Sequence, residues 1–287
     1  MSDAIDDFGP EEQRGRVLVI AGSDSSGGAG IQADIKTVTA LGGYAATAIT
    51  AVTVQNTMGV SAVHPVPLDI ITGQIGAVLD DIGADAIKTG MLASADVIEA
   101  VARALDAAKA QAIPLIVDPV MVTSSGARLV DDSALAAIKS VLVPRAALIT
   151  PNIPEAEALT GLSIKDLDGQ RAAAEALLKA GARAVLVKGG HMEGGDVIDC
   201  LLTRNGMRLF TRPRLRTRHT HGTGCTLASA IAALMAQGLA LDRAVEQAGD
   251  YLHEAIRQAP GFGKGSGPVH HGWTVQRSFA SAPVREG

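Results

Sequence analysis

The 287-residue sequence has few cysteines, few aromatic residues and no long hydrophobic run. Its two cysteines, Cys200 and Cys225, cannot build a disulfide framework and are not spaced as a CxxC pair, which favours a reducing compartment. The densest apolar stretch, Cys225 to Ala236, is well short of the roughly 20 residues that a membrane span needs. The first fifteen residues are polar and acidic and lack the apolar core of a secretion signal. We therefore expect a cytoplasmic protein without a membrane anchor.

Neither sign of charge is in large excess. The 25 Lys and Arg against 30 Asp and Glu give a net charge of −5, which favours neither nucleic acid nor an anionic membrane as partner. With 47% hydrophobic and 19% charged residues, the composition excludes a disordered chain, a collagen and a coiled coil. No repeat or Pro/Ser-rich linker divides the sequence. We expect one domain over 16–273, a disordered extension over 1–15 and a tail over 274–287.

Short β-branched runs alternate with Ala-rich segments of helical period. The predicted strands are Arg16–Ala21, Ala86–Thr89, Pro114–Asp118, Ala147–Thr150 and Ala184–Lys188, and helices are predicted near 29–41, 68–80, 95–110, 132–142, 153–159, 169–180, 223–237 and 242–258. This alternation predicts an α/β protein with a mostly parallel sheet between two layers of helices. Val197–Thr203 and Met207–Thr211, joined through an Asn-Gly turn, predict a hairpin that adds an antiparallel edge.

Ligands of open parallel sheets bind at the carboxyl ends of the strands, so the turns that follow strands are the candidate sites. The clearest is the loop from Thr220 to Thr226, where Gly222, Thr223 and Gly224 open an Ala-rich helix. Unpaired N–H groups and the positive end of the helix suit a transferring phosphate there. The sequence lacks GxxxxGK[ST], so this is not a Walker P-loop, and a plain glycine-rich turn remains the alternative.

Cys225 lies in the first turn of that predicted helix. The helix dipole stabilises a thiolate at this position, so we expect a pKa below the roughly 8.5 of a free thiol and a group able to accept a proton from a substrate hydroxyl. A small buried hydrophobic side chain is the alternative, and it is the more common state of a cysteine.

Three other strand ends carry charged or amide side chains. Asp118 ends a buried strand, where a carboxylate costs several kcal/mol unless it is paired, hydrated or metal-bound. Asn152 and Glu155 have the spacing of a helix capping box, but they could equally face the phosphate site and hold Mg²⁺ or its waters. Lys188 ends another strand and suits a phosphate contact, with extension into solvent as its alternative.

The first strand is followed by a glycine- and hydroxyl-rich run from Gly22 to Asp34 that could hold a small polar ligand. Asp34 falls inside the following helix although aspartate has low helix propensity. It either reaches back to the ligand or lies on a solvated helix face.

Taken in order, these motifs resemble a known family over roughly Val17 to His271. The matching segments are Gly22–Asp34, Gln55–Thr57, Lys88–Met91, Asp118–Val120, Pro151–Glu155, Lys188–His191, His221–Cys225 and Gly263–His271. They closely resemble the hydroxymethylpyrimidine/phosphomethylpyrimidine kinases of thiamine biosynthesis, a branch of the ribokinase superfamily.

The resemblance implies a ribokinase-like three-layer α/β/α sandwich, commonly a homodimer. It implies two transfers from ATP, first to the hydroxymethyl oxygen of 4-amino-5-hydroxymethyl-2-methylpyrimidine and then to the monophosphate. By resemblance, Gln55 contacts the pyrimidine edge with both a donor and an acceptor. By the same resemblance, the pocket is lined by Gly22, Asp34, Met91 and Val120. Cys225 is the proton acceptor, and Gly222–Gly224 form the anion hole. Lys188 contacts the phosphates of ATP, Asp118 and Glu155 bind Mg²⁺, and Asn152 is a further residue of the ATP site.

Two other functions stay open at this point. A vitamin B6 kinase of the same fold shares the glycine loop, and a pocket that differs by one group often discriminates by only about 10–200-fold. A module that binds the pyrimidine without catalysis is the second alternative. The presence of Cys225, Lys188, Asp118 and Glu155 argues against that module.

Overall fold

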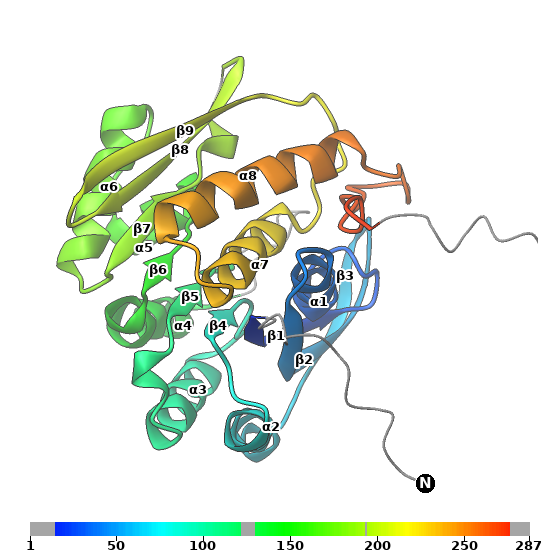
Figure 1. Cartoon of the computed structure of the whole chain (residues 1–287), viewed down its shortest axis with the longest axis vertical. Coiled ribbons are helices and arrows are strands. Elements are labelled where there is room, and N and C mark those ends of the chain that lie inside the picture. The colour runs from blue at the N-terminus through cyan, green and yellow to red at the C-terminus, as the bar shows by residue number, and fades with distance from the viewer. Residues whose placement is uncertain (1–14, 122–129, 193, 276–287) are drawn as a thin grey trace, which may run out of the picture.

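The computed structural model describes residues 15–121, 130–192 and 194–275, and in this part of the chain nine strands form one sheet (Figure 1). The strands are β1 (Arg16–Asp24), β2 (Tyr44–Asn56), β3 (Gly59–Pro65), β4 (Ala86–Thr89), β5 (Leu115–Val117), β6 (Leu148–Ile149), β7 (Ala184–Val187), β8 (Asp196–Thr203) and β9 (Gly206–Pro213). Their order across the sheet is β3-β2-β1-β4-β5-β6-β7-β8-β9. The predicted extension over 1–15 and the tail over 274–287 lie almost wholly outside the described residues.

The six strands from β2 to β7 in the sheet order run parallel, which confirms the predicted mostly parallel sheet. β8 and β9 form the predicted antiparallel hairpin through the turn at Asn205. Side chains of β1 alternate between the two faces of the sheet. Val17 and Val19 enter one hydrophobic core, whereas Leu18 and Ile20 enter the other.

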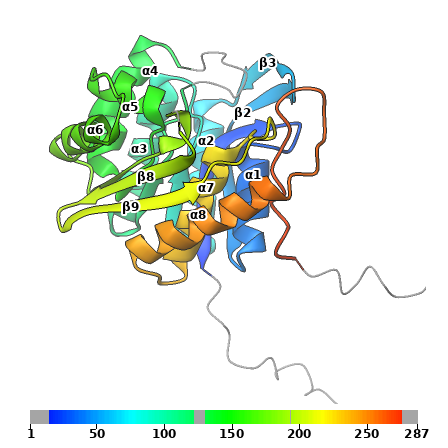
Figure 2. The same cartoon turned by 90° about the horizontal axis from the view of Figure 1, so that it is seen from above.

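Helices cover both faces, as Figure 2 shows from above. One layer holds α1 (Gly30–Ala40), α7 (Thr223–Ala236) and α8 (Leu241–Arg257), and the other holds α2 (Leu68–Asp81), α3 (Ala95–Ala107), α4 (Asp132–Ala137), α5 (Ile153–Thr160) and α6 (Leu167–Lys179). α7 is buried along nearly its whole length because its small side chains lie between the sheet, α1 and α8. The predicted helix over 132–142 ends as a π-helical turn over Ile138–Leu142.

The sheet differs from the prediction at its other edge. The sequence pattern predicts no strand between 44 and 65, whereas the structure has the antiparallel pair β2 and β3 there. β2 is rich in alanine, which is uncommon in strands, and much of β3 is exposed, so neither gives a clear hydrophobic alternation. The sheet therefore has antiparallel strands at both edges, and Gln55 lies near the end of β2.

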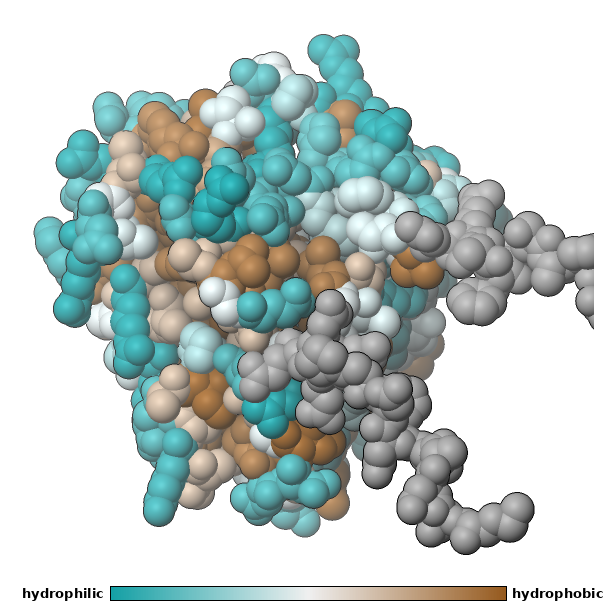
Figure 3. Space-filling model, viewed as in Figure 1, coloured by the Kyte–Doolittle hydropathy of each residue, from teal (hydrophilic) through white to brown (hydrophobic). Residues whose placement is uncertain are grey.

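The outer surface is predominantly polar where Figure 3 shows it. Hydrophilic residues dominate the rim of this face, and hydrophobic residues lie nearer its middle. Among the residues that the structure describes, no helix is both long and apolar enough to cross a membrane.

Candidate active site

A cavity of about 610 Å³ lies at the carboxyl ends of the parallel strands. The strand order reverses between β1 and β4, and such a switch point is where open α/β sheets bind ligands. All but one of the predicted site residues line this single cavity. They are Gly22, Gln55, Met91, Val120, Asp118, Asn152, Glu155, Lys188, Gly222, Thr223, Gly224 and Cys225. The exception is Asp34.

The glycine loop enters α7 through a conformation that requires glycine. Gly222 has φ +80°, and a Cβ atom there would lie 1.8 Å from the carbonyl oxygen of Gly28. The first turn of α7 begins at Thr223, and Gly222, Thr223 and Gly224 all line the cavity. The N–H of Thr223 also donates to the carbonyl oxygen of Thr220. A Cβ atom on Gly224 would lie 3.3 Å from Nζ of Lys188, so the lysine lies against this helix start. Backbone donors and a cation thus converge on one anion site.

Lys188 bridges two carboxylates beside that site. Its Nζ lies 3.1 Å from Oδ1 of Asp118 and 3.9 Å from Oε2 of Glu155. Burial alone would lower the pKa of Lys188, but Asp118 and Glu155 raise it, so the side chain is a cation. Burial, offset in part by Lys188, raises the pKa of Glu155 to about 7. The cluster therefore combines a fixed positive charge with a carboxyl group that titrates near neutral pH.

Asn152 and Glu155 form the capping box that was one of their two predicted roles. The side chain of Asn152 accepts a hydrogen bond from the N–H of Glu155, and Oε2 of Glu155 accepts one from the N–H of Asn152. Both residues also line the cavity, so the structural role does not remove them from the site.

The donor set fits Mg²⁺ better than a transition metal. Oδ2 of Asp118 is buried without a hydrogen-bond partner among the described residues, and Glu155 lies near the same lysine. Mg²⁺ commonly uses one or two carboxylates together with water and substrate phosphates. No cluster of three His, Cys, Asp or Glu side chains that could hold a metal ion occurs in the described parts of the chain.

Cys225 lines the cavity, but its predicted low pKa is wrong. Burial raises the pKa of the thiol to about 12, and the attraction of Lys88 lowers it only in part. The helix dipole favours the thiolate, but the loss of water around the buried sulfur outweighs it. At neutral pH the resting side chain is a thiol.

Asp34 does not line the cavity, contrary to the prediction. Its carboxylate is completely buried beneath the site, where Oδ1 lies 2.9 Å from Nζ of Lys88 and accepts a hydrogen bond from Ser229. Lys88 is also completely buried, on β4. Lys88 has no predicted role, although a lysine inside the apolar strand Ala86–Thr89 indicates a buried partner.

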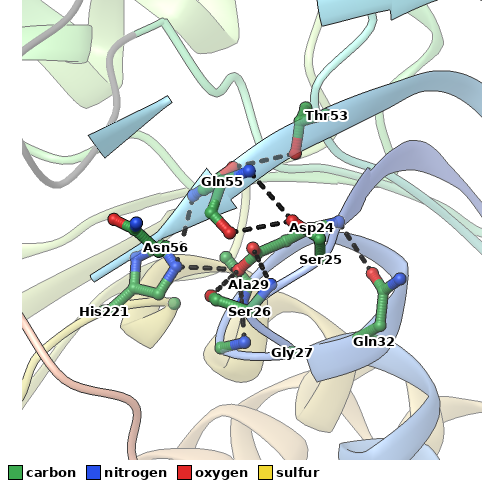
Figure 4. Close-up of polar contacts among 12 residues, drawn as sticks. Asp24, Ser25, Ser26, Gly27, Ala29, Gln32, Thr53, Gln55, Asn56 and His221 are labelled. Carbon is green, nitrogen blue, oxygen red and sulfur yellow. Dashed lines mark hydrogen bonds and ion pairs between the residues drawn. The ribbon is translucent and has the colours of Figure 1, made fainter. Parts of the chain in front are cut away.

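A second polar cluster, drawn in Figure 4, also lines the cavity. Asp24 accepts hydrogen bonds from Ser26, Gly28 and Ala29, and its Oδ2 lies 2.8 Å from Nε2 of His221. The same His221 nitrogen lies 3.3 Å from Nε2 of Gln55. Sequence reasoning assigned no role to Asp24 or His221, because the loop after β1 and the loop before α7 meet only in the folded chain.

Comparisons with known proteins find relatives along most of the chain. The profile of the family described as phosphomethylpyrimidine kinase matches residues 24–270. The hydroxymethylpyrimidine/phosphomethylpyrimidine kinase of Bacillus subtilis is 48% identical over 89% of this chain and 94% of its own length. The thiamine biosynthesis bifunctional protein ThiED of Geobacter sulfurreducens is 51% identical over 90% of this chain, which spans 52% of that longer protein.

Solved structures give the same fold. A phosphomethylpyrimidine kinase from Clostridium difficile has a TM-score of 0.76 at 42% identity and covers 85% of this chain and all of its own. A pyridoxal kinase from Staphylococcus aureus in complex with AMP-PCP and pyridoxal has a TM-score of 0.83 at 34% identity and covers 90% of this chain and 94% of its own. The chain belongs to the phosphomethylpyrimidine kinase family, and its fold is the ribokinase-like α/β/α sandwich.

Proposed function

We propose that this protein uses ATP to phosphorylate 4-amino-5-hydroxymethyl-2-methylpyrimidine to its monophosphate and then to its diphosphate in thiamine biosynthesis. One observation carries the proposal. The start of α7, Lys188 and Asp118 share one cavity with Gln55, so groups suited to a phosphate and a group suited to a polar ring edge line the same space. Such a cavity can bring a phosphoryl donor and an acceptor alcohol together.

The residues of the chain supply alignment and charge, which is most of what phosphoryl transfer needs. In this proposal the N–H groups of Gly222–Gly224 donate to the migrating phosphoryl group, and Lys188 balances the charge that develops on its oxygens. Gln55, with Gly22, Met91 and Val120, holds the ring so that its hydroxymethyl group points at α7. Asn152 belongs to the ATP side of the cavity.

Asp118 and Glu155 are proposed to hold Mg²⁺, directly or through its waters. When bound, the ion neutralises charge on the phosphates of ATP. The two carboxylates keep Lys188 between them, so they also set the position of the cation that faces the phosphates.

An ATP-consumption assay with the pyrimidine alcohol, its monophosphate and pyridoxal side by side tests the function. Turnover with both pyrimidines is expected. Turnover with pyridoxal alone would establish a vitamin B6 kinase, the activity that several similar structures bear in their names. Binding of the pyrimidine without ATP turnover would establish the non-catalytic module.

Cys225 is proposed to take the hydroxyl proton in the first transfer. We expect Cys225→Ala to slow the first transfer much more than the second, since the monophosphate is already largely ionised. Because the thiol has a pKa of about 12, the part of the first-step rate that depends on Cys225 should keep rising from pH 7 to pH 9. Single-turnover rates for each step measure this, and equal losses in both steps would refute the assignment.

Glu155 should make the folded protein less stable as pH rises through neutrality. Its pKa is about 7 in the folded state against 4.5 ordinarily, so its protonated form favours folding and that contribution is lost between about pH 4.5 and 7. Between pH 5 and pH 8, the free energy of unfolding in urea should fall less in Glu155→Gln than in wild type, by on the order of 1–3 kcal/mol. Glu175→Gln, in an exposed helical ion pair, is the control and should leave the slope unchanged.

We also propose that the protein is a cytoplasmic homodimer. The β2–β3 hairpin exposes large apolar side chains, among them Val54 (60% exposed) and Met58 (64% exposed). Apolar side chains gathered on one sheet edge are typical of a surface that pairs with another chain. Light scattering should give about twice the chain mass of 29.3 kDa, and a monomeric mass at micromolar concentration would contradict the dimer.

A further inference from the structure

The side-chain amide of Gln55 lies between two groups whose hydrogen-bonding roles are fixed by other contacts. Its Nε2 faces Nε2 of His221 at 3.3 Å, and its Oε1 faces Oγ1 of Thr53 at 3.2 Å. Figure 4 shows the amide between these two neighbours. The main chain of Gln55 cannot adjust easily, because its N–H and C=O are both bonded to the hydroxyl of Ser25. The roles of the two neighbours therefore decide which way the amide must point.

On one side, His221 must donate through Nε2. Asp24 receives N–H and O–H donors at both carboxylate oxygens, and Oδ2 of this group is the partner of Nε2 at 2.8 Å. Burial alone would raise the pKa of Asp24, but the hydrogen bonds from His221 and Ser26 lower it, so the group is an ionised acceptor. Nε2 of His221 therefore carries a hydrogen in either charge state of the ring. A glutamine NH₂ group facing that nitrogen would set two donors against each other.

On the other side, Thr53 must accept from Gln55. Its hydroxyl has a single hydrogen, and Oγ1 lies 2.8 Å from the carbonyl oxygen of Ser23, which can only accept. Toward Gln55, Oγ1 has only its lone pairs left, so it can only accept a hydrogen bond. Two oxygens facing each other here would be as unfavourable as two nitrogens at His221. Both neighbours thus require the amide with its oxygen toward His221 and its nitrogen toward Thr53.

We infer that Asp24, His221 and Thr53 fix the orientation of the Gln55 amide and through it set the preference for an aminopyrimidine over a pyridine ring. This inference rests on the proposed function. A 4-aminopyrimidine presents an amino donor beside a ring-nitrogen acceptor. It therefore matches the amide only when the amide oxygen faces the amino group and the amide NH₂ faces the ring nitrogen. The hydroxymethyl group must also point at α7, so the ring cannot turn over to match a reversed amide. Asp24, His221 and Thr53 are positioning residues that act through Gln55.

The test compares kcat/KM for the pyrimidine alcohol with that for pyridoxal in variants from both sides of the amide. Thr53→Val removes the hydroxyl that accepts from Nε2 of Gln55. Asp24→Asn places an NH₂ group opposite His221, so Nε2 of His221 no longer has to be a donor. Each should lower the ratio about tenfold or more, with KM for ATP unchanged. Thr53→Ser, which keeps the hydroxyl, should recover most of the ratio. Ser26→Ala, which removes one donor from Asp24 but leaves His221 paired, should keep the ratio within about twofold.

Equal loss for both substrates in Thr53→Val and Asp24→Asn would overturn the inference, as would a ratio in Ser26→Ala that falls as far as in Asp24→Asn. Calorimetric dissociation constants for both ligands without ATP give the same ratio independently of turnover. Wild-type protein that binds the pyrimidine but never phosphorylates it would refute the proposed function. The binding ratio would still decide the role of the three positioning residues. Variants that unfold are recognised by their thermal transitions. Because Thr53→Val and Asp24→Asn act on different sides of the amide, one variant can still test the inference if the other does not fold.

Discussion

Replacing Lys188 with methionine is expected to lower kcat by about 10³-fold and to change KM for the pyrimidine alcohol by less than about threefold. A cation or donor that balances charge on a migrating phosphoryl group contributes on the order of 10²–10⁵ in rate. Lys188 lies against the first turn of α7, whereas Gln55, which we propose holds the ring, lies on β2. Loss of the charge should therefore appear in the chemical step.

Other cations at the cavity are poorly placed to replace Lys188. Arg212 donates to the carboxylate of Asp250 and to the carbonyl oxygen of Glu246. Arg214 donates to carbonyl oxygens of the segment that follows β7, including that of Gly190. Because both guanidinium groups are held by other partners, neither is free to move to the start of α7 without breaking those bonds.

Lys188→Met also leaves two buried carboxylates without their shared cation, so stability must be measured beside activity. Thermal unfolding should show a folded but less stable protein. Lys179→Met, at the exposed end of α6, controls for the loss of one positive charge and should retain wild-type activity. A loss confined to KM, or a fall in kcat of less than tenfold, would contradict the role given to Lys188.

The layered fold and the place of the site were predictable because both depend on local sequence patterns. Apolar strands that end in Asp118 or Lys188 show where the parallel sheet presents polar groups, and the glycines at 222 and 224 show where a helix start is open. These signals can be recognised without knowing which residues distant in sequence lie nearby in the fold. All four positions line the cavity that the structure shows.

The failures have a common cause, which is that they depend on partners distant in sequence. Asp34 could be placed only by knowing that Lys88 lies 2.9 Å away, on a strand 54 residues later. The pKa of Cys225 depends on burial produced by the surrounding layers. β2 is held between β1 and β3, so pairing in the sheet outweighs the weak strand propensity of its alanines.

The largest effect on stability is expected at the buried Lys88–Asp34 pair. Both side chains are completely buried, so either one left alone is an uncompensated charge in the core. Lys88→Met and Asp34→Leu should each destabilise the protein by about 3–5 kcal/mol, which is a fall in Tm of roughly 10 °C for a domain of this size. Urea unfolding and thermal scans of both single variants measure this cost.

The double variant Lys88→Met/Asp34→Leu separates the cost of a lone charge from the value of the pair. Because the desolvation of both charges is avoided, it should be clearly more stable than either single variant and within about 2 kcal/mol of wild type. A double variant that loses the sum of the single losses would show that the pair does not interact across its 2.9 Å contact. Since Lys88 lowers the pKa of Cys225 and Asp34 raises it, Lys88→Met should react more slowly with a thiol-alkylating reagent at pH 9 than wild type does, and Asp34→Leu should react faster. Opposite changes of the alkylation rate in the two single variants would tie the buried pair to the chemistry of the site above it.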